Sequence, residues 1–131
     1  MGIALSQRGV QPDVIYTSTA LRARTTAEIV ADQLGYSRPD IIANRNFYLA
    51  DPRTLMGLVH QFDESTDTAM IFGHNPGMHE FANLLSGDGE VDEFPTLGVA
   101  RIELKVDYWG EVDWSCGLLL EVLTPKTLKN D

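Results

Sequence analysis

The segment "AMIFGHNPGMHEFANLL", residues 69–85, passes from an apolar run through a turn rich in glycine and proline into a helical pattern. The apolar run shows no alternation of polar and apolar residues, which is typical of a strand covered on both faces. Pro76 suits the first turn of the following helix, and Gly87 is expected to end that helix. A strand that leads directly into a helix favours an α/β fold with a parallel sheet.

The sequence before this segment repeats the same order of elements. Residues 13–18 ("DVIYTS") and 40–44 ("DIIAN") are expected to be strands. A helix capped by Ser18 or Thr19 should follow the first of them and end at Gly35. The predicted apolar face of that helix consists of Leu21, Ala23, Ala27, Ile29, Val30 and Leu34.

Further elements complete the predicted fold. The first residues resemble the last turns of a helix that Gly9 stops, and a helix is expected from Pro52 onwards. The runs 97–106 and 115–123 predict two strands joined as a hairpin at the sheet edge. This order predicts a three-layer α/β/α sandwich with a mainly parallel sheet. No repeat or change of composition divides the chain, so we expect a single domain over residues 1–131.

Composition narrows the classes of function. The formal net charge is −9, which argues against binding to nucleic acid or to an anionic membrane surface, although local arginines can still hold a small anion. The apolar runs are too short to span a bilayer. A single cysteine, Cys116, excludes an internal disulfide. With no signal peptide evident at the first residues, we expect a cytoplasmic protein.

In open α/β sheets, ligands bind at the carboxyl ends of the strands. After the first strand, Ser18 and Thr19 stand at a helix N-terminus, which favours anions, and Arg22 lies one turn inside that helix. The Arg22 guanidinium could form hydrogen bonds to a phosphate. Arg24 is two positions further along and is expected on a different face of the helix. The alternative is that both arginines are solvated or paired with carboxylates, and for the arginines alone that alternative is the better one.

After the third strand, the sequence Gly-His-Asn-Pro-Gly places His74 at the rim of the sheet with little bulk around it. His60 and His79 lie in helical patterns beside polar residues and are expected to be surface histidines. The sequence contains no metal-ligand cluster, serine elbow, Walker loop or dinucleotide fingerprint, so we expect neither a metal nor a cofactor. An arginine and an imidazole together suit phosphoryl chemistry.

Several segments of the chain resemble one family. They are "IYTSTALRARTTAEIVADQLG", "FYLADP", "IFGHNPGMHEFANLL", "EFPTLGVARIEL" and "VLTPKTL". In this order they resemble the SixA-type phosphohistidine phosphatases of the histidine phosphatase superfamily. The resemblance implies a phosphoglycerate-mutase-like fold. It also implies hydrolysis of phosphohistidine, or another small phosphoryl group, through a phosphohistidine intermediate without a metal.

The resemblance also assigns site residues. Arg22 matches the second phosphate-binding arginine and His74 the second active-site histidine, while Asn75 and Thr96 are implied to lie at the phosphate site. The family's nucleophilic histidine lies in an Arg-His-Gly or Arg-His-Ala motif after its first strand, and this sequence contains neither motif. We therefore expect a domain that lacks the family's first strand and catalytic loop. A chain of this sequence is expected to be catalytically inactive.

Three explanations of the missing motif remain open. The chain is a shortened form of a longer enzyme, which we favour, or a non-catalytic module that binds phosphate or phosphoproteins. In the third, two copies of a dimer fill the gap. The expected ligand is a phosphorylated protein or a small phosphorylated substrate. Self-association would cover the backbone groups that a missing central strand leaves unpaired.

Overall fold

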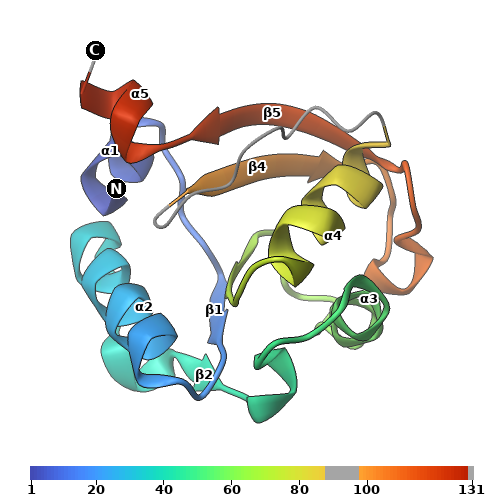
Figure 1. Ribbon diagram of the computed structural model, residues 1–131, viewed down its shortest axis with the longest axis horizontal. Coiled ribbons are helices and arrows are strands. Elements are labelled where there is room, and N and C mark those ends of the chain that lie inside the picture. Colours follow the sequence, from blue (N-terminus) through green and yellow to red (C-terminus); the bar gives the residue numbers. More distant parts are fainter. Residues whose placement is uncertain (88–97, 130–131) are drawn as a thin grey trace. The chain divides into compact units, whose positions relative to one another are not determined.

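The computed structural model describes residues 1–87 and 98–129. The elements follow one another as predicted, with helices between the strands of a parallel sheet and a hairpin near the C-terminus (Figure 1). The helices are α1 (Gly2–Gln7), α2 (Leu21–Leu34), α3 (Pro52–His60), α4 (Gly77–Ser86) and α5 (Pro125–Lys129). The strands are β1 (Val14–Thr17), β2 (Ile42–Ala43), β3 (Ala69–Phe72), β4 (Val99–Leu104) and β5 (Gly117–Leu123).

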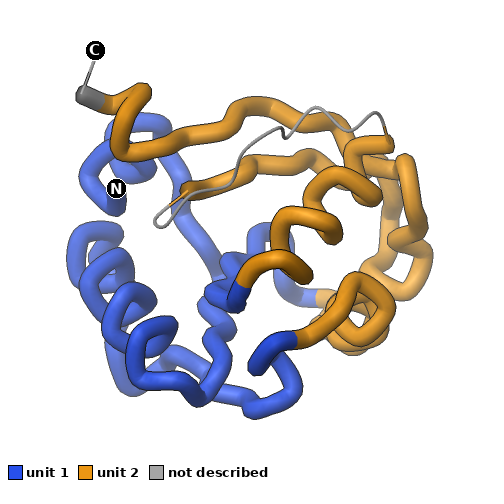
Figure 2. The backbone as a smooth tube through the Cα atoms, viewed as in Figure 1, with its two compact units in different colours: residues 1–49, 65–74 blue, residues 50–64, 75–131 orange. Residues whose placement is uncertain are grey.

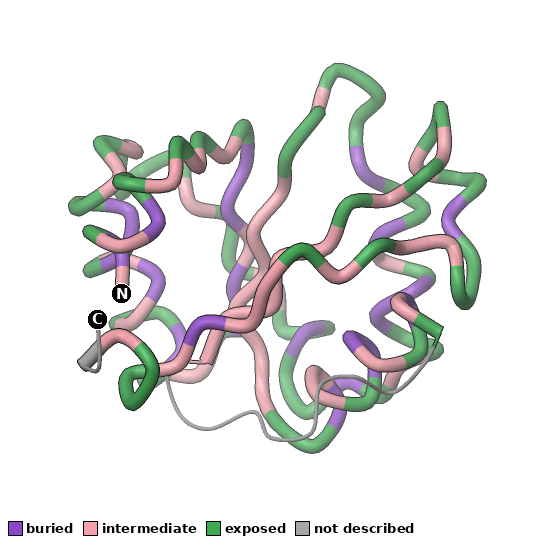
Figure 3. The backbone as a smooth tube through the Cα atoms, turned by 90° about the horizontal axis from the view of Figure 1, so that it is seen from above, coloured by how far each residue is buried: buried purple, intermediate pink, exposed green. Residues whose placement is uncertain are grey.

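The chain divides into two compact units (Figure 2). The first contains residues 1–49 and 65–74, and the second contains residues 50–64 and 75–131. Along α2, α3 and α4 buried positions recur between exposed ones, so each of these helices has one buried face (Figure 3). Within the described ranges, no helix combines the length and the apolar character needed to cross a membrane.

The first unit contains a three-stranded parallel sheet in the order β2–β1–β3. Val14 is paired with Ala69 and Tyr16 with Ile42. This arrangement confirms the predicted α/β class and parallel sheet. The prediction that β3 is covered on both faces is wrong, because all four of its residues are only half-buried. In the described part of the chain, β3 has a strand partner on one edge alone.

The core of this unit lies between α2 and the sheet. Ile15, Ala27 and Ala31 are fully buried, and Tyr36, Ile41, Met70 and Phe72 pack against them. The predicted apolar face of α2 is partly wrong: Leu21 is 79% exposed and Ile29 is 51% exposed. The buried stripe follows Ala23, Ala27, Val30 and Ala31 instead. Small side chains at helical spacing form this stripe, and Leu21 and Ile29 lie off it.

The predicted ends of the first two helices are largely confirmed. Gly9 follows α1 with φ 75° and Gly35 follows α2 with φ 74°, a conformation that glycine adopts without strain. The predicted start of α2 is wrong, because Ala20 occupies its N-cap and no side chain caps it. Ser18 instead continues the β1 ladder, since its N–H donates to the Phe72 carbonyl at 3.0 Å.

The second unit begins with α3, whose N-cap Asp51 accepts the Thr54 N–H at 2.8 Å. Pro52 stands at the first helical position, as predicted. Helix α4 packs against α3 and against both strands of the hairpin, and Gly87 ends it with φ 88°. Its buried residues are Gly77, Phe81, Ala82 and Leu85.

Strands β4 and β5 are antiparallel, with Val99 opposite Leu123 and Leu104 opposite Gly117, which confirms the predicted hairpin. In the described ranges the hairpin forms a two-stranded sheet of its own. Thr96, which the family resemblance implied to lie at the phosphate site, is outside the described residues.

Candidate active site

The carboxyl ends of β1 and β3 meet because these strands are adjacent and parallel. Thr17 is paired with Phe72 at the last rung of the ladder. Ser18 follows β1 directly, and His74 comes two residues after the end of β3. The topology therefore brings both residues to one edge of the sheet, where parallel α/β proteins bind their ligands.

A short hydrogen bond joins these two residues. Ser18 Oγ lies 2.7 Å from His74 Nε2. Ser18 is fully buried, while His74 is half-buried. The Ala20 N–H also donates to Ser18 Oγ, at 3.4 Å. The His74 imidazole is therefore hydrogen-bonded to the segment that connects β1 with α2.

An aromatic ring holds the same imidazole from another direction. The rings of Tyr48 and His74 form an edge-to-face pair, with centroids 5.2 Å apart and planes at 75°. Tyr48 follows Phe47, which is 2% exposed and packs against Tyr16 of β1 with ring centroids 5.7 Å apart. Edge-to-face pairs of this kind are favourable contacts between rings. Burial of the preceding residue thus places Tyr48 beside the histidine.

Arg22 is the second residue of α2 and therefore lies in its first turn, not one turn inside it as predicted. Its side chain is exposed, and its guanidinium forms no hydrogen bond or ion pair with residues 1–87 or 98–129. The same holds for Arg24. Within these ranges neither arginine has a carboxylate partner. No hydrogen bond of the described structure joins Arg22 to His74.

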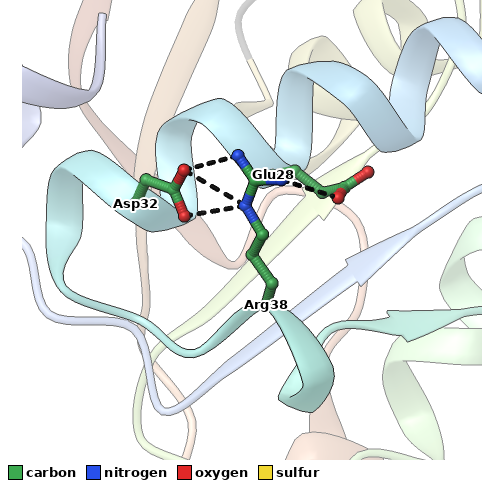
Figure 4. A network of polar contacts seen from close by, with 3 residues as sticks. All are labelled: Glu28, Asp32 and Arg38. Atoms are coloured by element: carbon green, nitrogen blue, oxygen red, sulfur yellow. Dashed lines mark hydrogen bonds and ion pairs between the residues drawn. The ribbon is translucent and has the colours of Figure 1, made fainter.

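A different arginine of the first unit is the one with carboxylate partners (Figure 4). Arg38 Nε donates to Asp32 Oδ1 at 2.9 Å, and Arg38 Nη1 donates to Glu28 Oε2 at 3.3 Å. The hydrogen bonds from Arg38 lower the pKa of Asp32, and Asp32 in turn raises the pKa of Arg38. The charge of Arg38 is balanced by Asp32 and Glu28. Arg22, at the N-terminus of α2, has no such carboxylate partner among the described residues.

The remaining residues singled out in the sequence belong to the second unit where the structure describes them. Asn75 follows His74 and is exposed. His60 Nε2 lies 2.7 Å from the Val112 carbonyl, which can only accept, so the His60 ring donates there. His79 lies within α4 and is half-buried. Among the described residues, no three His, Cys, Asp or Glu side chains are grouped so that they could hold a metal ion.

No protein-family model and no curated protein sequence matches the chain. Solved structures do match it. One assigned as a phosphohistidine phosphatase SixA from Agrobacterium tumefaciens has a TM-score of 0.78 and 25% identity, over 95% of this chain and 75% of that chain. A second with the same assignment, from Nakamurella multipartitia, has a TM-score of 0.74 and 20% identity, over 95% and 79%.

The third match is the structure of the protein histidine phosphatase SixA complexed with tungstate. Its TM-score is 0.81 at 18% identity, over 97% of this chain and 78% of that one. The chain has the SixA-like histidine phosphatase fold. This confirms the resemblance found in the sequence and the phosphoglycerate-mutase-like α/β fold that it implied.

Two residues that contact the histidine of this SixA-like chain are not in the site predicted from the sequence. The local pattern around Ser18 indicates only a cap and a helix N-terminus. Tyr48 lies in the segment "FYLADP" that resembles the family, but the resemblance assigns no role to it. A signal for Ser18 exists, because it directly follows a strand predicted to be parallel to the strand before His74. Tyr48 follows a 3₁₀ turn, Arg45–Phe47, and its approach to the ring depends on packing that no local pattern encodes.

Proposed function

We propose that this chain is a phosphohistidine phosphatase-like protein that binds a phosphoryl group through His74 and Arg22. The observation that carries the proposal is the 2.7 Å contact between Ser18 Oγ and His74 Nε2, which fixes the imidazole at the carboxyl ends of two adjacent parallel strands. The SixA-like fold supplies the expected class of ligand.

The chemistry of these groups fits an oxyanion. A phosphoryl group spreads negative charge over its oxygens, so it needs hydrogen-bond donors and positive charge held in place. Arg22 supplies a guanidinium without a carboxylate partner among the described residues, and the first turn of α2 contains no acidic residue. The free N–H groups and the dipole of the helix N-terminus add to the attraction for an anion.

The proposal separates binding from turnover. In the family resemblance, a nucleophilic histidine after an arginine attacks phosphorus, and the resulting phosphohistidine is hydrolysed by water. None of the three histidines of this sequence follows an arginine. The residues of this chain therefore bind the phosphoryl group, and hydrolysis requires a nucleophile that none of them supplies. The proposed ligand is a phosphorylated protein side chain, and the other candidate is a small phosphorylated compound. We also propose that the protein is cytoplasmic.

Titration with tungstate tests the binding part, because tungstate is the oxyanion in one of the matched structures. Calorimetry is expected to detect binding, and Arg22→Ala should weaken it about ten- to a hundredfold, the usual range for a hydrogen bond to a charged group. Arg24→Ala is the matched control and should leave the affinity unchanged. Equal affinities of the wild-type and Arg22→Ala proteins would contradict the proposed role of Arg22.

Incubation with a phosphohistidine peptide tests the turnover part. The expected result is binding of the peptide without release of phosphate and without an acid-labile phosphorylated protein. Phosphate release that depends on His74 would show that this chain contains its own nucleophile and would overturn the separation. Self-association stays a prediction, which sedimentation can measure.

A further inference from the structure

We propose that Ser18 is a positioning residue that holds the proton of the neutral His74 ring on Nδ1, so that Nδ1–H becomes a hydrogen-bond donor to the ligand. Only the identity of that ligand, a phosphoryl oxygen, rests on the proposed function. The position of the proton follows from the hydrogen bonds of the first unit and can be measured without any ligand.

The hydrogen-bonding capacity of Ser18 decides where the proton lies. A serine hydroxyl has one proton to donate and two lone pairs that accept. The Ala20 N–H, at 3.4 Å, can only donate, so Ser18 Oγ accepts from it. Across residues 1–87 and 98–129, the remaining atom at hydrogen-bond distance from Ser18 Oγ is His74 Nε2, at 2.7 Å. The hydroxyl proton therefore has Nε2 as its acceptor.

The burial of Ser18 favours a hydrogen bond in which Ser18 donates to His74 Nε2 over the reverse direction. Ser18 is 0% exposed, so bulk water cannot accept its hydroxyl proton. If Nε2 carried the proton and donated to Ser18, the hydroxyl hydrogen would point into the protein with no acceptor in the described structure. Buried donors are rarely left in that state, because they lose the hydrogen bond that water would have given them.

The consequence appears at the other ring nitrogen. A neutral imidazole carries one proton, so a ring that accepts at Nε2 must carry it at Nδ1. His74 Nδ1 makes no hydrogen bond with the described residues, and the ring also forms an edge-to-face pair with Tyr48. Nδ1–H is thus available to a ligand. Without Ser18, a neutral histidine favours the Nε2–H form, whose Nδ1 lone pair would repel an oxyanion.

His60 supplies an internal reference with the opposite assignment. Its Nε2 lies 2.7 Å from the Val112 carbonyl, which accepts only, so His60 must carry its proton on Nε2. One spectrum of the unmodified protein therefore contains two histidines that should report opposite tautomers. The His60→Gln and His74→Gln variants assign the two sets of signals.

The experiment is a long-range proton–nitrogen NMR correlation on the uniformly nitrogen-15-labelled 131-residue chain, without ligand and at about pH 8.5, where imidazoles are neutral. We expect His74 to show a pyridine-type Nε2 and a pyrrole-type Nδ1, and His60 to show the reverse. A pyrrole-type Nε2 at His74 in the wild-type protein would overturn the proposal, whatever any variant does.

Variants separate the positioning role from general damage to the fold. Ser18→Ala should shift His74 toward the Nε2–H form, and Ser18→Thr, which keeps the hydroxyl, should restore the Nδ1–H form. Thr17→Val is the matched control, because Thr17 is a buried neighbour whose hydroxyl donates to the Ser18 carbonyl and forms no hydrogen bond with His74 in the described structure. An unchanged His74 tautomer in a folded Ser18→Ala protein would contradict the proposal.

Tungstate binding then distinguishes this inference from the proposed function. Loss of the tautomer in Ser18→Ala should weaken tungstate binding about tenfold, while Thr17→Val should bind normally. If the tautomer is as expected but the wild-type protein does not bind tungstate, the position of the proton stands and the proposed function fails. If tungstate binds and His74 is the Nε2–H form, the proposed function stands and the role of Ser18 fails.

Discussion

Asp13 and Thr68 are joined by two hydrogen bonds in opposite directions: Asp13 Oδ2 accepts the Thr68 N–H at 2.9 Å, and the Thr68 carbonyl accepts the Asp13 N–H at 2.8 Å. These bonds close the first end of the β1–β3 ladder, and the Ser18–Phe72 bond closes the other end at 3.0 Å. A slip of register would move His74 away from Ser18. The Asp13–Thr68 hydrogen bonds at the start of the strands therefore help to fix the register that brings Ser18 and His74 together at the other end.

Asp13→Ala is expected to lower the free energy of unfolding. The substitution removes the acceptor for the N–H groups of Asp67 and Thr68, which Asp13 Oδ2 binds at 2.8 and 2.9 Å. Urea denaturation followed by circular dichroism measures the effect. Asp40→Ala is the control, because the Asp40 side chain makes no hydrogen bond or ion pair with the described residues. Equal stability of the two variants would contradict the structural role of Asp13.

The same carboxylate should make stability depend on pH in acid. Hydrogen bonds from the backbone N–H groups of Thr68 and Asp67 hold the pKa of Asp13 below its ordinary value of 3.8. The folded state therefore favours the charged form, and the contribution of Asp13 is fully present above that ordinary pKa. It is lost as the pH falls through the lowered pKa. The stability difference between wild type and Asp13→Asn should shrink on acidification below 3.8, and a difference that stays constant there would exclude this linkage.

Features that depend on neighbours in the chain could be predicted from the sequence. Gly9, Gly35 and Gly87 were each expected to stop a helix, and each has a positive φ. Pro52 was expected in a first helical turn and stands there. In these cases one residue has a backbone preference that its neighbours reinforce, so the local sequence contains enough information.

Features that depend on distant residues could not be predicted in the same way. Ser18 follows the pattern of a helix cap, yet its hydroxyl binds a histidine 56 positions away. Ile29 fits the pattern of a core residue, but the alanines of α2 form the close contact with the sheet and leave it exposed. Local propensity is overridden wherever tertiary packing offers a better partner. Of the two predicted site residues in the first unit, His74 is hydrogen-bonded to another side chain, and Arg22 forms no side-chain hydrogen bond or ion pair with the described residues.

Gly77→Ala should destabilise the second unit. An added Cβ would lie 1.9 Å from the Ala50 carbonyl oxygen, which is backbone and cannot move aside easily. Overpacking of this kind lowers stability by about 1–3 kcal/mol. Gly57→Ala is the control, because its Cβ would meet nothing within 4 Å and alanine is the better helix former by about 0.5–1 kcal/mol. Thermal unfolding should move in opposite directions for the two variants, and a parallel shift would contradict the close approach at Gly77.

A double-mutant cycle between Tyr48 and His74 should reveal a favourable coupling. The rings are 5.2 Å apart and nearly perpendicular, a geometry worth about 0.5–1.5 kcal/mol beyond the area it buries. Tyr48→Ala and His74→Ala each remove other contacts as well, including the bond from Ser18, but the cycle cancels these and isolates the ring pair. Tyr48→Phe keeps the aromatic ring and should keep the coupling. The measurement is the free energy of unfolding of the four proteins in urea. Additive effects of the two alanine substitutions would show that Tyr48 does not hold the imidazole, which would leave Ser18 as its one described anchor.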